Sequence, residues 1–131
     1  MSDPLHLDFA ECHRLALRSA AVEGPCSCRN NPLTGWESMP LSLPETQLRD
    51  LGCLGVPGED EPSYEEYLPD GIRYWSANAP IAVRHFPYNR CNVWECVLCG
   101  RCYLRYTEGG GYFVDKRIRL LDPALMVDAP L

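Results

Sequence analysis

The chain lacks any apolar run that approaches the ~18 residues needed to cross a bilayer. Its first residues, MSDPLHLDFAECHRL, also lack the basic start and continuous apolar region of a secretory signal peptide. We therefore expect a cytoplasmic protein without a membrane partner, in which thiols stay reduced. The eight cysteines are then expected to be metal ligands or small buried side chains rather than disulfides.

Histidine is scarce, with three in 131 residues, so the chain offers few general bases. The sequence also lacks a Gly-x-Ser-x-Gly elbow, a phosphate-binding loop and a dinucleotide fingerprint. The pattern around the metal-binding cysteines of zinc deaminases is missing as well. We therefore expect no enzymatic activity, no catalytic residues and no small-molecule substrate.

Positive charge is scarce in the first part of the chain, and the formal net charge is −6. Residues 1–83 carry 13 acidic and 5 basic side chains, whereas residues 84–131 carry 5 acidic and 7 basic ones. This distribution opposes non-specific binding of nucleic acid by the whole surface. It suits a basic protein partner, but solubility alone is the favoured explanation of the acidic charge.

A single domain is expected over residues 1–131, with an acidic helix- and turn-rich part at 1–71 and a β part at 72–131. Asp8 and Glu11 form a capping box, so a helix should begin after Asp8 and end before Gly24. Its buried stripe should contain Phe9, Cys12, Leu15, Ala16, Ser19 and Val22, with Cys12 as a small core residue.

Strand formers dominate after residue 72. Residues 102–121 predict a hairpin with a glycine loop at 109–111, and residues 71–86 predict further β structure. Residues 43–51 predict a short helix, and the apolar residues after Pro123 should dock on the core. The expected fold is α+β: a small antiparallel sheet with an N-terminal helix.

The segment CVLCG at 96–100 has the form of a metal knuckle, in which Cys96 and Cys99 hold one ion from a tight turn eased by Gly100. An aromatic-rich strand follows at once. Over residues 85–120 this pattern resembles zinc ribbons and rubredoxin-like proteins. The resemblance implies a zinc-ribbon-like hairpin and two further ligands. Those families usually draw them from a second C-x-x-C, which is missing here apart from the overlapping Cys99–Cys102 pair.

Three sources compete for the two further ligands. A turn at 86–89 should bring His85 towards Cys91, so we rank the set His85, Cys91, Cys96 and Cys99 first. Cys102 ranks lower because it lies on the core side of the following strand. Cys26 and Cys28 rank last because one intervening residue makes it hard for both sulfurs to reach one ion.

Zinc is the expected metal. Its expected role is structural rather than catalytic, because thiolate ligands weaken zinc as a Lewis acid. The alternative is a [2Fe–2S] cluster, since Cys91 to Cys99 has the C-x4-C-x2-C spacing of plant-type ferredoxins. No cysteine after Cys102 could serve as the distant fourth ligand of that family.

A partner surface is expected where Arg105, Arg117 and Arg119 follow one face of the hairpin beside Tyr103. The first hypothesis is a zinc-stabilised protein that binds another protein, as an immunity or antitoxin-type protein or an adaptor would. The second is a zinc-ribbon protein that binds nucleic acid through this arginine face. The third is an iron–sulfur or thiol redox protein.

Overall fold

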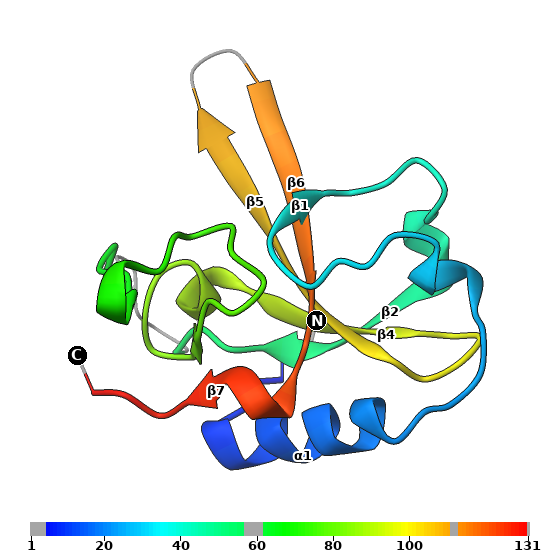
Figure 1. The fold of residues 1–131 in the computed structure, drawn as a ribbon, viewed down its shortest axis with the longest axis horizontal. Helices are drawn as coiled ribbons and strands as arrows, with labels where there is room; N and C mark the ends of the chain where they lie inside the picture. Colours follow the sequence, from blue (N-terminus) through cyan, green and yellow to red (C-terminus); the bar gives the residue numbers. More distant parts are fainter. Residues whose placement is uncertain (1–4, 57–61, 111–112, 131) are drawn as a thin grey trace.

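The computed structural model describes residues 5–56, 62–110 and 113–130, which form one helix and two sheets (Figure 1). The helix is α1 (Phe9–Ala20). The strands are β1 (Glu37–Ser38), β2 (Leu48–Cys53), β3 (Ile81–Ala82), β4 (Asn92–Cys96), β5 (Cys102–Gly110), β6 (Phe113–Leu120) and β7 (Met126–Val127). The expected α+β class is confirmed. Among the described residues, no helix has the length and apolar character needed to cross a membrane.

Helix α1 begins where its local signals predict. The Asp8 carboxylate accepts a hydrogen bond of 2.8 Å from the backbone N–H of Glu11, which satisfies one free donor of the first turn. Cys12, Ala16 and Ser19 are buried on its inner face. The Ser19 hydroxyl accepts from the Cys102 backbone N–H at 2.8 Å and so joins the helix to β5.

The main sheet has the strand order β1-β6-β5-β4-β2, and every neighbouring pair is antiparallel. The predicted hairpin is its central pair, β5 and β6, whose outer part extends beyond the other strands (Figure 1). Gly111, in the predicted glycine loop, lies outside the described residues.

Two local predictions are wrong in extent or type. The short helix expected at 43–51 is a 3₁₀ turn at Glu45–Gln47 followed by strand β2, because residues 48–53 pair with β4. The β structure expected at 71–86 is reduced to the two residues of β3. That strand pairs in parallel with β7, so the predicted docking of the C-terminal residues is confirmed.

Each face of the main sheet carries its own core. Because side chains alternate along a strand, Leu104 and Tyr103 of β5 point to opposite sides. Leu104 belongs to the larger core, which also contains Cys12, Trp36 and Val93. Tyr103 belongs to the smaller core, whose buried members are Cys28, Leu33, Leu43, Leu48, Cys96, Tyr103 and Ile118. The smaller core therefore brings residues 28–43 against β4 and β5.

Candidate metal centre

Four cysteines from two distant segments meet at one edge of the smaller core. Cys96 and Cys99 come from the turn between β4 and β5, and Cys26 and Cys28 come from the segment that follows α1. The Sγ atoms of Cys26 and Cys96 are 3.7 Å apart, and those of Cys28 and Cys99 are 3.6 Å apart. All four Sγ atoms lie within 4.8 Å of one another. We call this group the four-cysteine centre.

These separations fit four thiolates around one ion. A tetrahedral zinc site with Zn–S bonds of about 2.3 Å places its sulfurs about 3.8 Å apart. The Cys26–Cys96 and Cys28–Cys99 separations of 3.7 and 3.6 Å agree with that value. A disulfide would require about 2.05 Å, and all eight cysteines are free. The four-cysteine centre can therefore hold a metal ion.

The turn that carries Cys96 and Cys99 has the expected knuckle geometry. Gly100 adopts a φ of +90°, a conformation that side-chain-bearing residues rarely adopt. Its N–H donates to the Cys96 carbonyl at 2.9 Å, and the Cys96 N–H donates to the Arg101 carbonyl at 2.8 Å. These bonds close the turn and fix the direction of both thiols.

The segment that carries Cys26 and Cys28 bends between the two residues. A 3₁₀ turn covers Ser27–Arg29, and the Arg29 N–H donates to the Cys26 carbonyl at 2.9 Å. Cys26 itself is extended, so the chain changes direction at the start of this turn. This bend lets the two sulfurs face the same point in space, although only one residue separates them.

Hydrogen-bond donors surround the sulfurs from outside the centre. Gln47 donates through Nε2 to the Cys96 Sγ at 3.4 Å, and the Tyr103 hydroxyl donates to the Cys28 Sγ at 3.1 Å. The backbone N–H of Arg101 donates to the Cys99 Sγ at 3.5 Å. Such outer donors stabilise thiolates and orient metal ligands.

These hydrogen bonds have their clearest effect on the pKa of the Cys96 thiol. Burial opposes ionisation of its thiol, but hydrogen bonds from Gln47 and from the backbone of Leu98 and Cys99 outweigh it and lower the pKa to about 7. For Cys28 the balance is reversed, because burial raises its pKa above the ordinary range despite the Tyr103 hydroxyl. The hydrogen bonds thus favour the thiolate form of Cys96, which is the form that binds a metal ion.

The structure places His85 and Cys91 away from the four-cysteine centre. Cys91 is buried in the larger core, where its Sγ donates to the Pro87 carbonyl at 3.3 Å. The His85 ring lies 5.5 Å from the ring of Tyr67. The extended strand β4 separates Cys91 from Cys96 by about 16 Å along its length, which a single ion cannot span. The predicted set of His85, Cys91, Cys96 and Cys99 therefore does not assemble.

Cys102 is also apart from the centre, because it belongs to the larger core on the opposite face of the sheet. This agrees with the prediction, from the alternation of side chains along the strand, that Cys102 is a core residue. Cys26 and Cys28, the last-ranked candidates from the sequence, are the residues that complete the group. In the sequence, the only indication that they bind a metal is their close spacing, Cys26-Ser27-Cys28, in a turn-rich segment. The ferredoxin-like set is not formed either, because Cys91 lies elsewhere.

The predicted arginine face does not exist as one surface. Directly opposed residues of an antiparallel pair share a face, and Arg105 opposes Ile118 whereas Arg119 opposes Leu104. Arg119 is fully buried and donates to the Tyr88 hydroxyl at 2.6 Å and to the Ala79 carbonyl at 2.7 Å.

The other predicted partner-binding residues are also buried or ion-paired within the chain. Tyr103 is fully buried beside Cys28. Arg105 forms an ion pair with Glu45, and Arg117 forms one with Asp115 at 3.1 Å. Arg119 and Tyr103 therefore support the interior of the fold rather than a partner surface.

No family model matches the chain, and neither a curated protein nor a solved structure was found to match it. The four-cysteine centre is compatible with a zinc-knuckle motif, and it could hold a metal ion.

Proposed function

We propose that the chain is a zinc-stabilised binding protein in which the four-cysteine centre holds one structural Zn²⁺. One observation carries this proposal: four thiols lie within 4.8 Å of one another, and two of the sulfur–sulfur separations, 3.7 and 3.6 Å, match the value of a tetrahedral zinc site. The ion would join the segment at 26–28 to the β4–β5 turn and so hold the smaller core against the sheet.

The ligand set favours a structural role over a catalytic one. Four thiolates fill all four tetrahedral positions and leave none for water or a substrate. Their combined negative charge also weakens zinc as a Lewis acid. We therefore propose that the chain acts by binding rather than by catalysis.

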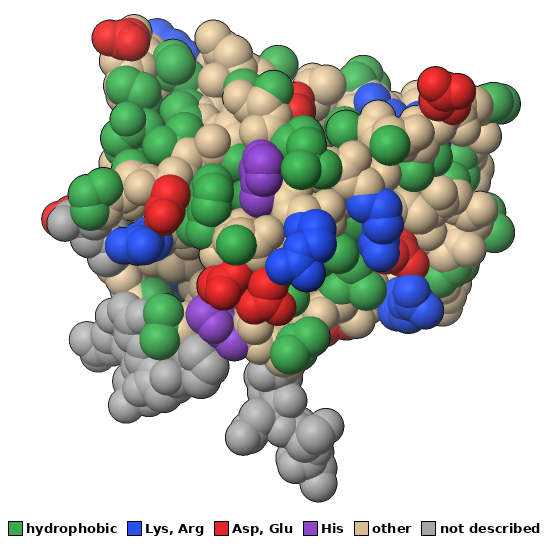
Figure 2. Space-filling model, turned by 90° about the horizontal axis from the view of Figure 1, so that it is seen from below, with side chains coloured by type: hydrophobic (Ala, Val, Ile, Leu, Met, Phe, Trp, Pro, Cys, Tyr) green, Lys and Arg blue, Asp and Glu red, His purple; other side chains and the backbone are tan. Residues whose placement is uncertain are grey.

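A protein partner is the better-supported type of partner. The four residues expected to contact a partner offer no basic surface of the kind that nucleic acid or an acidic protein needs, because two are buried and the other two are ion-paired within the chain. The face that carries α1 shows acidic and basic side chains interspersed rather than one basic patch (Figure 2). At the tip of the knuckle, Val97 and Leu98 are exposed, and apolar side chains of this kind contribute to protein–protein interfaces.

Within this class, the acidic charge of −6 suits an immunity or antitoxin-type protein that neutralises a basic toxin, or an adaptor. The test is affinity capture from the native cytoplasm, with protein and nucleic acid both identified. Recovery of a basic protein that stays bound to the chain after nuclease treatment would support the proposal. Recovery of nucleic acid alone would contradict it.

The metal is tested separately, by elemental analysis and an absorption spectrum of protein purified without added metal. One zinc per chain without visible absorbance is expected, and it should be lost in Cys96→Ser. Cys53→Ser is the matched control, because Cys53 is a half-buried cysteine outside the four-cysteine centre. Iron together with visible colour would contradict this proposal and favour an electron-transfer protein. The absence of both metals would favour a thiol redox protein.

A further inference from the structure

The four-cysteine centre contains two close sulfur pairs, and each pair combines a half-buried cysteine with a buried one. Cys26 is half-buried, and its Sγ lies 3.7 Å from that of the fully buried Cys96. Cys99 is half-buried, and its Sγ lies 3.6 Å from that of Cys28, which is 2% exposed. A small molecule from solvent can therefore reach one sulfur of each pair, while the buried sulfur lies beside it.

The same geometry suits the formation of disulfides. A disulfide requires sulfurs about 2.05 Å apart, so each pair has to close by roughly 1.6 Å. Both partners of a pair lie on turns, one at Ser27–Arg29 and its flank and the other between β4 and β5. Each pair joins these two segments. Two disulfides would therefore keep the connection between the segments after the metal has left.

A cation lies beside the half-buried sulfur of Cys99. The Arg101 guanidinium donates through Nη1 to the Cys99 Sγ at 3.6 Å, and its Nη2 is held by the Gly24 carbonyl at 2.8 Å. A neighbouring cation stabilises a thiolate, and it also stabilises the negative charge that develops on an oxygen leaving nearby. Cys99 is therefore the sulfur at which an oxidant should react first.

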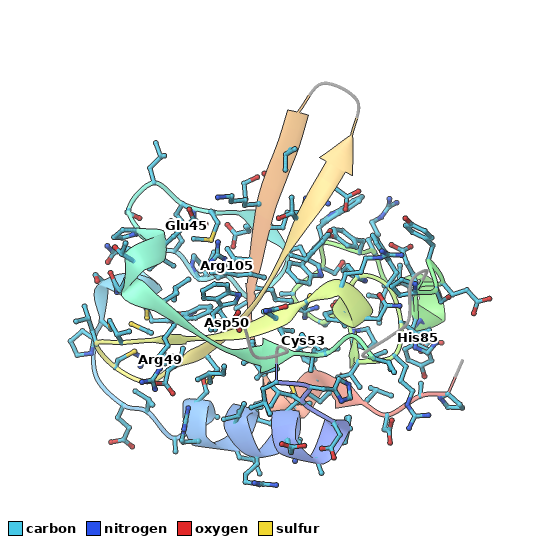
Figure 3. All side chains as sticks on the ribbon, turned by 180° about the vertical axis from the view of Figure 1, so that it is seen from behind. Glu45, Arg49, Asp50, Cys53, His85 and Arg105 are labelled. Atoms are coloured by element: carbon cyan, nitrogen blue, oxygen red, sulfur yellow. The ribbon has the colours of Figure 1, made fainter. Side chains whose placement is uncertain are left out.

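Cys53 provides a reference thiol within the same chain. It is half-buried like Cys99, but its Sγ donates to the Gly55 carbonyl at 3.7 Å and it lies outside the four-cysteine centre. It is at the end of β2 that pairs with the start of β4, away from the turn that carries Cys99 (Figure 3). Exposure alone would make the two thiols react alike, whereas a built site would make Cys99 react first.

We infer that the four-cysteine centre is a redox switch for hydroperoxides, which convert its two close sulfur pairs into two disulfides and release the metal. This inference rests on the proposed zinc site. At the tip of the same turn, Val97 and Leu98 are exposed. Closure of the sulfur pairs changes the shape of that turn, so oxidation alters the surface that it offers to a partner.

The chemistry balances with one hydroperoxide for each disulfide. The Cys99 sulfur attacks one peroxide oxygen, so that an S–O bond forms, the O–O bond breaks and the other oxygen leaves as hydroxide or alkoxide and takes a proton from water. The Cys28 thiolate then attacks the oxidised sulfur, the S–S bond forms and hydroxide leaves. Two electrons pass from the sulfurs to the peroxide. The pair of Cys26 and Cys96 reacts in the same way, and loss of the four thiolates releases the ion.

The test uses the full zinc-loaded chain, whose metal content is measured first, and hydrogen peroxide as the probe. A chromogenic chelator follows zinc release, and mass spectrometry of alkylated peptides identifies the disulfides. About two equivalents of peroxide per chain should release the zinc, because each disulfide consumes one. The peptides should contain the Cys28–Cys99 and Cys26–Cys96 disulfides, while Cys53 stays reduced. A dithiol reductant with added zinc should restore the metal-bound form.

Two arginine variants test the local environment without removing a ligand. Arg101→Gln should slow zinc release several-fold, because the cation beside Cys99 is lost. Arg49→Gln is the matched control, since Arg49 is exposed and pairs with Glu95 rather than with a cysteine, and its release rate should be unchanged. Cys53→Ser should also release zinc at the unmodified rate.

Three results have distinct meanings. Zinc that stays bound until Cys53 has been oxidised by a large excess of peroxide would overturn the inference and leave the zinc proposal intact. Disulfides between separate chains, or between Cys96 and Cys99 of one turn, would overturn it as well. A chain that holds no zinc before peroxide is added would contradict the zinc proposal itself, so the two failures are distinguishable.

Discussion

Removal of the metal from the four-cysteine centre is expected to destabilise the folded chain by about 4 kcal/mol or more. Cys26 and Cys96 are 70 residues apart in the sequence, so the ion acts as a cross-link that closes a long loop. For a loop of this length, the chain-entropy relation for cross-links gives about 4 kcal/mol. Metal–thiolate bonding adds to this value, because the ligand set does not exist in the unfolded chain.

The loss is large compared with the stability of a typical domain, about 5–15 kcal/mol. The assay is urea unfolding of the protein with and without a zinc chelator, followed by circular dichroism. The midpoint should fall sharply on chelation in the unmodified chain and in Cys53→Ser. In Cys96→Ser the chelator should have no effect, because the metal is already lost.

A double-substitution cycle sharpens this prediction. If one ion joins both segments, Cys28→Ser and Cys96→Ser each remove it, and the double variant should be little less stable than either single variant. Independent roles for the two cysteines would instead make the losses add. Additive losses, or a midpoint that chelation leaves unchanged, would refute the cross-link reasoning.

Three further predictions concern other parts of the fold. Arg119→Met should destabilise by about 3 kcal/mol in thermal unfolding, because buried oxygen acceptors lose their donor, whereas Arg73→Met at an exposed position should have almost no effect. In thiol labelling of the metal-loaded chain, the half-buried Cys53 should react before Cys12, because burial and nearby Cys102 raise the pKa of Cys12 to about 12; faster labelling of Cys12 would contradict its burial. Hydrogen bonds from Lys and Arg side chains lower the pKa of Glu45, so its contribution to stability is present above the unfolded-state pKa and lost as the pH falls through the folded-state value. Glu45→Gln should therefore be less stable than the unmodified chain in urea at pH 7, and this difference should shrink as the pH falls through the folded-state pKa of Glu45.

Helix α1 was predictable because its signals are local. Asp8 satisfies a backbone donor three residues away, and the apolar side chains recur at the helical period. The hairpin of β5 and β6 was predictable for the same reason. The short helix at 43–51 was wrong because pairing with β4 outweighed a weak local preference.

The tertiary structure decided the partners of Cys96 and Cys99. Their own knuckle geometry depends on the five consecutive residues 96–100, of which Gly100 is the last, so the sequence alone identified it. Cys26 and Cys28 arrive from about 70 residues away, because the smaller core folds their segment onto β4 and β5. No local pattern encodes that approach.

The arginines also separate what the sequence predicts from what the tertiary structure decides. The sequence by itself determined that Arg105 and Arg119 lie on strands, but the faces they occupy depend on the register between β5 and β6. That register places Arg119 in the interior, against the Tyr88 hydroxyl and the Ala79 carbonyl, and Arg105 on the opposite face, over the ring of Trp94. Local chemistry determined which elements form, whereas contacts between distant segments decided which side chains meet, because only packing of the whole chain determines those neighbours.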